Sequence, residues 1–189
     1  MTHVDPDGAS AGPRHLVVMG VSGTGKTSVG QRLADHLGAE FLEGDAYHPD
    51  GNIEKMRAGV PLTDEDRWPW LRTLARLIAD RDRDGEATVL TCSALRRSYR
   101  DVLRTAVPPP RLVFVHLHAS AEVLQRRMGQ RTGHFMPAAL LRSQLDTLEP
   151  LDPDEAGVVL DVSADLDDVV RAAAAALTAP GVPEPDDGD

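Results

Sequence analysis

Short apolar runs alternate along this chain with longer segments whose apolar residues recur every three or four positions. The runs have the character of buried parallel strands, and they cover 15–20, 40–45, 87–92, 111–117 and 157–162. The segments with helical spacing cover 29–37, 68–78, 97–106, 121–130, 138–148 and 165–177. Regular alternation of strand and helix predicts an α/β fold, a five-stranded parallel sheet with helices on both faces.

Local signals mark some helix ends. Gly38 follows the first helical segment and predicts its end there. Thr63 and Asp66 have the spacing of a capping box and predict a helix start just before Trp68. The segment 46–62 is polar and contains glycine, and no element is assigned to it.

The length of 189 residues suits one domain. Residues 1–14 and 179–189 are polar, the second segment being rich in acid and proline, and both are predicted to be disordered tails. The folded domain is therefore expected at 15–178.

Composition narrows the class of protein. A net charge of -10 argues against non-specific nucleic-acid binding, which needs a basic surface. No apolar run approaches the roughly 20 residues that span a bilayer, and residues 1–14 lack the apolar core of a signal peptide. The single cysteine excludes an internal disulfide. We therefore expect a cytoplasmic protein that does not bind membranes.

One glycine-rich motif carries most of the functional signal. It lies between the first strand and the first helix, and it reads Gly20, Val21, Ser22, Gly23, Thr24, Gly25, Lys26, Thr27. Its backbone N–H groups and the helix N-terminus suit phosphates, while Lys26 can reach the β- and γ-phosphates. The Thr27 hydroxyl can join a Mg²⁺ shell. The motif predicts a site for ATP and Mg²⁺.

Residues beyond the motif narrow the type of nucleotide enzyme. A GTPase or motor ATPase would end its third strand with an aspartate, but here Thr91 is followed by Cys92 and Ser93. Glu43 and Asp45 are the nearest carboxylates, and their spacing predicts that both face one side of an extended segment. Either can hold a magnesium-bound water, and Asp45 can accept the proton of an attacking hydroxyl. These features favour a kinase.

A lid is expected at about 124–148, since a kinase must exclude water from the transferred phosphate. Arg127 and Arg131 are four residues apart, so one helical face can bring both onto the phosphates of ATP. Gly133 provides a flexible joint.

At this point the chain resembles the gluconate kinases, from about Leu16 to Leu177. The matching residues are Gly44, Asp45, His48, Pro49, Asn52, Ile53, Lys55, Met56, Gly59, Pro61, Leu62, Asp64, Asp66, Arg67, Pro69, Trp70, Leu71, Cys92, Ser93, Ala94, Leu95, Tyr99, Arg100, Asp101, Arg131, Gly133, His134, Phe135 and Met136. The resemblance implies a P-loop fold of the nucleoside-monophosphate-kinase type with a small helical lid. It also implies ATP-dependent phosphorylation of D-gluconate at the 6-hydroxyl, and it suggests dimers.

Gluconate is an anion with several hydroxyls, so its site needs a fixed cation and hydrogen-bonding groups. Arg67 suits the carboxylate because its guanidinium forms a planar fork. His48 and Ser93 are expected to bind hydroxyls. The family pattern also implicates Arg97, in a basic pair with Arg96 where the family more often has lysines, and His134 of the lid.

Two other functions stay open from the sequence. One is a P-loop kinase for another small acceptor, such as shikimate or a nucleotide, and the other is a nucleotide-sensing protein without transferase activity. His116 and His118 have strand spacing for a shared metal, but no third ligand accompanies them. Cys92 is expected to be a buried structural residue.

Overall fold

A computed structural model describes residues 14–129 and 138–178, and its centre is a five-stranded, fully parallel sheet in the order β2-β3-β1-β4-β5. The strands are β1 (His15–Met19), β2 (Glu40–Glu43), β3 (Thr88–Thr91), β4 (Leu112–His118) and β5 (Gly157–Asp161). The predicted parallel α/β sheet is confirmed. The predicted tails fall almost entirely outside the described residues.

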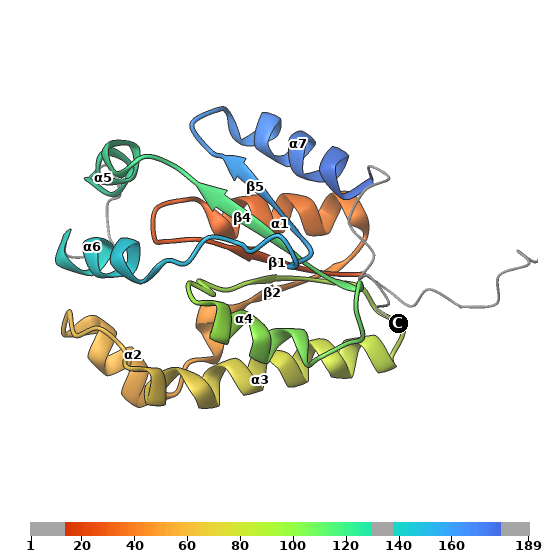
Figure 1. Ribbon diagram of the computed structural model, residues 1–189, viewed down its shortest axis with the longest axis horizontal. Helices are drawn as coiled ribbons and strands as arrows, with labels where there is room; N and C mark the ends of the chain where they lie inside the picture. The colour runs from red at the N-terminus through yellow and green to blue at the C-terminus, as the bar shows by residue number, and fades with distance from the viewer. Residues whose placement is uncertain (1–13, 130–137, 179–189) are drawn as a thin grey trace, which may run out of the picture.

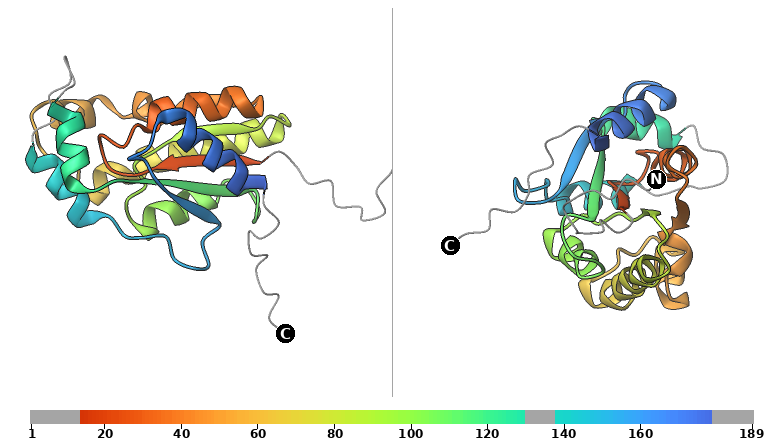
Figure 2. Two further views of the ribbon diagram at one scale, coloured as in Figure 1. Left: turned by 90° about the horizontal axis from the view of Figure 1, so that it is seen from above. Right: turned by 90° about the vertical axis from the view of Figure 1, so that its right-hand side faces the viewer.

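Helices cover both faces of the sheet (Figures 1 and 2). They are α1 (Lys26–Leu37), the 3-10 helix η1 (Gly44–Tyr47), α2 (Asp50–Arg57), α3 (Asp64–Arg83), α4 (Arg97–Arg104), α5 (Ala121–Gly129), α6 (Ala138–Thr147) and α7 (Leu166–Thr178). Figure 1 shows α1 and α7 on one face and α3 and α4 on the other, while α2, α5 and α6 lie toward one end. None of the helices in the described part combines the length and apolar character needed to cross a membrane.

The side chains of β1 point alternately to the two faces of the sheet, and each face carries its own apolar core. Leu16 and Val18 pack in the cluster that includes residues of α1 and α7, whereas Val17 and Met19 pack in the cluster beneath α3 and α4. Successive side chains of a strand point to opposite faces, so each strand of a doubly covered sheet is apolar throughout. This is why the central strands β1 and β4 appear in the sequence as nearly continuous apolar runs, whereas the edge strand β2 begins and ends with glutamate.

The predicted helix ends are confirmed. Gly38 adopts a left-handed conformation, φ 63°, and its N–H donates to the carbonyl of Ala34. At the start of α3, Thr63 accepts from the N–H of Asp66 at 3.3 Å, and the Asp66 carboxylate accepts from the N–H of Thr63 at 2.9 Å. This reciprocal capping box fixes the direction in which α3 leaves the preceding loop.

The unassigned segment 46–62 contains a helix, α2. Its charges follow the helix dipole, with Asp50 in the first turn and Lys55 and Arg57 in the last. Pro49 precedes it and Gly59 follows it with φ 73°. These were usable signals, but Gly51 and the low apolar content hid the helical period.

One buried histidine of the sheet makes stability depend on pH. His116 of β4 is 5% exposed, and neither ring nitrogen has a hydrogen-bond partner among the described residues. Burial lowers the pKa of His116 to about 4 from its ordinary value of 6.5. In the unfolded chain, His116 is protonated as the pH falls through about 6.5. In the folded protein, it is protonated only as the pH falls through about 4.

We expect the free energy of unfolding to fall by about 3 kcal/mol through His116 as the pH drops from 6.5 to 4. Above pH 6.5 the residue is neutral in both states and contributes no pH dependence. Denaturant titrations at several pH values should show a smaller acid slope for His116→Phe. His36→Gln, on the exposed side of α1, is the control and should keep the wild-type slope. An unchanged slope in His116→Phe would contradict the assignment.

Candidate active site

The glycine-rich motif forms a phosphate-binding loop between β1 and α1. Gly20 has φ +135°, and a Cβ there would lie 2.5 Å from the carbonyl oxygen of Leu117. Gly25, at φ +90°, is the N-cap residue of α1 and has no side chain to cap the helix. The first amides of α1 therefore keep their hydrogens for a ligand, at the positive end of the helix dipole.

Side chains of the loop hold it closed on itself. The Lys26 ammonium donates to the carbonyl oxygen of Val21 at 3.1 Å, and the buried Thr24 hydroxyl donates to the same oxygen at 2.9 Å. Gly23 completes the curl with φ +87°. Thr27 is exposed in the first turn of α1. The loop thus presents an ammonium, a hydroxyl and backbone amides together.

A cavity opens beside this loop, at the carboxyl ends of the strands, where ligands of open α/β sheets bind. It is bounded by the loop, by the end of α2 with the segment that follows it up to Leu62, and by α6. Six of the predicted site residues line it: Ser22, Lys26, Asp45, His48, Arg67 and Ser93. The structure therefore brings Lys26, the lysine expected at the phosphates, and the expected acceptor-side residues into one cavity.

Asp45 lies on η1, directly after β2, and its side chain is 72% exposed in the opening of the cavity. The expectation that Glu43 and Asp45 share one side of an extended segment is wrong. The strand ends at Glu43, and the 3-10 helix turns Asp45 out of its plane. Glu43 instead accepts a hydrogen bond from the Thr91 hydroxyl, while Asp45 lines the cavity and Glu43 does not.

His48 is 8% exposed and stacks on Trp70, with ring centroids 4.0 Å apart and an interplanar angle of 18°. Its Nε2 lies 3.9 Å from an Asp45 carboxylate oxygen, and its Nδ1 lies 3.3 Å from the Asn52 amide nitrogen. Burial lowers the pKa of His48, so its neutral form is favoured. Trp70 is held in turn by a 2.8 Å hydrogen bond to the Gly44 carbonyl.

Arg67, in the first turn of α3, presents its guanidinium to the cavity. Its Nη2 donates to the carbonyl of Leu62 at 3.1 Å, and its carbon Cζ lies 5.5 Å from the centroid of the Tyr99 ring. Its Nε is buried and has no hydrogen-bond partner among the described residues. Arg67 lines the cavity and forms no ion pair with any described residue, so its guanidinium is suited to an anion brought by a ligand.

The turn after β3 forms another part of the wall. Ser93 lines the cavity, and its carbonyl accepts from the N–H of Gly20 at 3.3 Å. Ala94 follows with φ 44°, a conformation that is strained for a residue other than glycine. Such strain is concentrated at functional sites, and here the turn joins β3 to the phosphate-binding loop.

Arg97 and Arg127, like Thr27 and Glu43, are absent from the cavity lining. Arg97 forms ion pairs with Asp152 at 2.9 Å and Asp154 at 2.7 Å, which direct its guanidinium to the surface. Arg127 of α5 donates to the carbonyl of Val162, beyond β5. Arg131 and His134 lie outside the described residues.

Helix α6 supplies residues that the sequence analysis missed. Ser143, Gln144 and Thr147 line the cavity, and the Gln144 amide oxygen accepts from the N–H of Ser22 at 2.7 Å. Their only signal was a polar face on a helix otherwise rich in leucine. Trp70 was also missed as a wall residue.

A buried ion pair fixes the end of α6. Arg100 and Glu155 are both 0% exposed in their side chains and pair through two contacts of 2.7 Å. Arg100 also donates to the carbonyls of Glu149 at 3.1 Å and Pro150 at 3.0 Å. The chain leaving α6 is thereby tied to α4, which positions the polar face of α6 against the loop.

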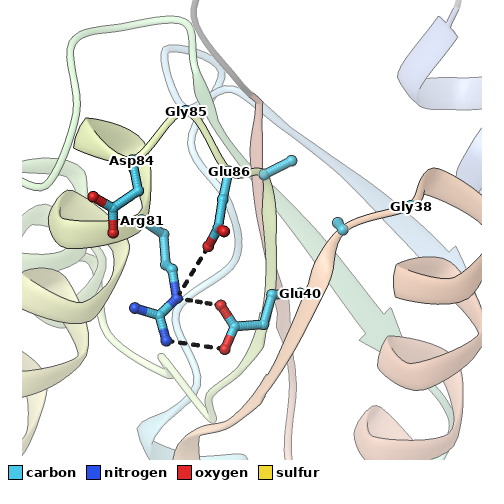
Figure 3. A pocket seen from close by; sticks show the side chains of 8 residues that line it. Gly38, Glu40, Arg81, Asp84, Gly85 and Glu86 are labelled. Atoms are coloured by element: carbon cyan, nitrogen blue, oxygen red, sulfur yellow. Dashed lines mark hydrogen bonds and ion pairs between the residues drawn. The ribbon is translucent and has the colours of Figure 1, made fainter.

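A second hollow lies at the amino ends of β2 and β3, away from the phosphate-binding loop (Figure 3). There Arg81 donates to both oxygens of Glu40, and its Nε lies 3.6 Å from Glu86. Arg81 lowers the pKa of Glu40. Arg81 pairs with two of the acidic residues of this hollow, so it has the character of a surface ion-pair cluster.

Comparison with known proteins agrees with this geometry. A family model described as an AAA domain matches residues 16–151. The chain is 54% identical, over 143 residues, to a gluconokinase from Gluconobacter oxydans, with 76% of this chain and 79% of that protein covered. The chain belongs to the gluconokinase family.

Two solved structures share the fold of this chain over most of its length. A gluconokinase from Sinorhizobium meliloti is 52% identical with a TM-score of 0.80, covering 87% of this chain and 91% of that one. A sugar kinase from Janibacter is 54% identical with a TM-score of 0.82, covering 90% and 98%. The expected P-loop kinase fold is confirmed.

Proposed function

We infer that this protein transfers the γ-phosphoryl group of ATP to the 6-hydroxyl of D-gluconate, giving 6-phospho-D-gluconate and ADP. One observation carries this inference: Lys26, Asp45 and Arg67 line a single cavity in a chain of the gluconokinase family. The loop with Lys26 lies at one side of the cavity and is suited to phosphates, and the Arg67 guanidinium lies at the other and is suited to a carboxylate.

Asp45 is proposed to act on the acceptor hydroxyl. Its exposed carboxylate stands in the same cavity as the Lys26 ammonium, so a hydroxyl between them can face both groups. In the transfer, the hydroxyl oxygen forms a bond to the γ-phosphorus as the bond from that phosphorus to the bridging oxygen of ADP breaks. The hydroxyl proton passes to Asp45.

Arg67 is proposed to bind the carboxylate at the other end of gluconate. Its place in the cavity lining supports this role, since a planar carboxylate can accept from a guanidinium fork. Trp70 and Leu62 line the same region and shield the pair from water. His48 and Ser93 are proposed to bind hydroxyls between the two ends, and their place in the cavity lining supports this.

Mg²⁺ is proposed to accompany ATP. Among the described residues no three His, Cys, Asp or Glu side chains form a metal-holding group, so an ion held mostly by phosphates fits better than an all-protein cage. Thr27 is exposed next to the loop and would hold the ion, with Asp45 or Glu43 acting through water. When bound, the ion would neutralise charge on the phosphates.

Three further points belong to this proposal. Arg127, Arg131 and His134 are proposed to act from the lid, where sequence spacing and the family pattern support them. A cytoplasmic location is supported by the need for ATP, and a homodimer by the family resemblance.

An assay of ADP release across acceptors tests the function. The purified protein should release ADP with gluconate and not with shikimate, a nucleoside monophosphate or water alone. Phosphorus NMR should show one phosphomonoester, 6-phosphogluconate, in amounts equal to ADP. Turnover with another acceptor and not with gluconate would overturn the assignment.

Replacing Arg67 with alanine is expected to raise KM for gluconate by about 10- to 100-fold, because a charge-assisted hydrogen bond is worth about 1.5–3 kcal/mol. KM for ATP should change little. Initial-rate kinetics with each substrate varied in turn provide the measurement.

Arg72→Ala is the matched control, since Arg72 is exposed on the same helix. It should leave both constants unchanged. If Arg67→Ala keeps the wild-type KM for gluconate, the carboxylate is bound elsewhere.

A further inference from the structure

Asn52 lies behind the cavity and contacts His48 directly. It is a residue of α2, 5% exposed, and is absent from the cavity lining. Its amide nitrogen makes two contacts: the Asp66 carbonyl oxygen at 2.9 Å and His48 Nδ1 at 3.3 Å. Asn52 therefore joins α2 to the start of α3 and to the histidine.

These two contacts determine the tautomer of His48. A carbonyl oxygen can only accept, so the Asn52 group that faces Asp66 must be the amide NH₂. The second hydrogen of that NH₂ then points at His48 Nδ1, which must accept it. A neutral imidazole with an accepting Nδ1 carries its hydrogen on Nε2.

The remaining contacts hold this arrangement in place. Stacking on Trp70 fixes the plane of the His48 ring. Asp66 is fixed because its N–H and carboxylate form the capping box, and Lys55 of α2 donates to both of its carboxylate oxygens at 2.7 and 2.8 Å. The carbonyl that orients Asn52 is thus part of a rigid corner.

The Nε2 of His48 faces the reacting end of the cavity. It lies 3.9 Å from the Asp45 carboxylate, and both residues line the cavity. An oxygen about 2.8 Å from each of these two atoms satisfies hydrogen-bond geometry. A hydroxyl there would accept from the Nε2 hydrogen and donate to Asp45.

We propose that Asn52 is a positioning residue that keeps His48 in its Nε2-protonated tautomer, so that His48 donates to the acceptor hydroxyl while Asp45 accepts its proton. The inference rests on the proposed function for the identity of that hydroxyl. With one lone pair of the hydroxyl bound by His48 and its proton by Asp45, the other lone pair is directed at the phosphorus. The opposite tautomer would turn a bare nitrogen toward the hydroxyl and compete with Asp45 for its proton.

Long-range proton–nitrogen NMR of the full-length protein at pH 8 tests the tautomer without any need for activity. The His48 signals, identified by their loss in His48→Gln, should show the hydrogen on Nε2 and a bare Nδ1. A hydrogen on Nδ1 in the wild-type protein overturns the proposal, whatever the variants do.

Two variants test the consequence. Asn52→Asp places a carboxylate against Nδ1 and should move the hydrogen to that nitrogen. Asn52→Leu removes the hydrogen bond and should give a mixture of tautomers. In both, kcat for gluconate should fall by about 10- to 100-fold with little change in KM for ATP.

Glu54→Gln, an exposed change on the same helix, should leave the spectrum and kcat as in the wild type. A lowered melting temperature with unchanged kcat in folded Asn52→Leu would show that Asn52 is only structural and would overturn the proposal. If the wild-type protein has the Nε2 tautomer and yet does not phosphorylate gluconate, the proposed function fails and not the tautomer assignment.

Discussion

Asp45→Asn is expected to lower kcat for gluconate phosphorylation by about 10²- to 10⁴-fold, the range of general-base catalysis. Asparagine keeps the size and most of the hydrogen bonding of the side chain but does not accept a proton. Since Asp45 is exposed at the cavity opening, the fold should survive. Initial rates at saturating ATP and gluconate, with circular dichroism for the fold, provide the measurement.

Asp50→Asn is the matched control for this change. Asp50 is an exposed aspartate in the first turn of α2 and is not part of the cavity lining. Its kcat should remain within about twofold of the wild type, because only a helix-dipole contribution is lost. Equal losses in the two variants would show that Asp45 acts through stability or general charge rather than on the acceptor.

Lys26→Met is expected to lower kcat by at least about 10²- to 10³-fold, comparable to the loss of one donor from a preorganised anion site. Methionine keeps the aliphatic stem, so the change removes the ammonium and its 3.1 Å hydrogen bond to Val21. ATP affinity, measured by calorimetry, should weaken as well, because the same ammonium is proposed to contact the phosphates before and during transfer.

Arg32→Met serves as its control. Arg32 lies on the same helix, and its ion pair with Asp167 has side chains that are 54% and 70% exposed. Such a surface pair contributes about 0–1 kcal/mol to stability and nothing to the site. The account would be contradicted if Lys26→Met retained near-wild-type turnover.

The fold could be predicted from the sequence because its signals are local. Apolar runs gave the strands, Gly38 and Thr63 marked helix ends, and the alternation of elements implied a parallel sheet. The 3-10 helix at Gly44–Tyr47 was missed because it directly follows β2 and, with four residues, is too short to show a helical period. Because this helix was missed, Glu43 and Asp45 were wrongly predicted to face the same side of an extended segment.

The site could be predicted in part. The phosphate-binding loop is a contiguous motif, so its eight residues were found together. Asp45 was found from its place after the second strand, and the family resemblance brought in His48 and Arg67. The contribution of Gln144 could not be predicted, because it depends on α6 packing against a loop 122 positions away in the sequence. Such placement is set by long-range contacts, here including the buried pair of Arg100 and Glu155.

Arg97 was predicted to bind the substrate, but in the structure it pairs with carboxylates at the surface. A basic residue beside Ser93 is a reasonable expectation for an anionic substrate, yet Asp101, Asp152 and Asp154 compensate its charge on the surface. Sequence alone does not reveal which cations are already paired. The informative cation is Arg67, which lines the cavity and forms no ion pair in the described part of the chain.

The orientation of gluconate between Arg67 and the phosphate-binding loop is the central claim. A crystal structure with a non-hydrolysable ATP analogue and gluconate measures it directly. We expect the gluconate carboxylate on the Arg67 guanidinium and the 6-hydroxyl between Asp45 and the γ-phosphate. Gluconate bound outside this cavity, or with its carboxylate against Lys26 and its 6-hydroxyl at Arg67, would contradict the account.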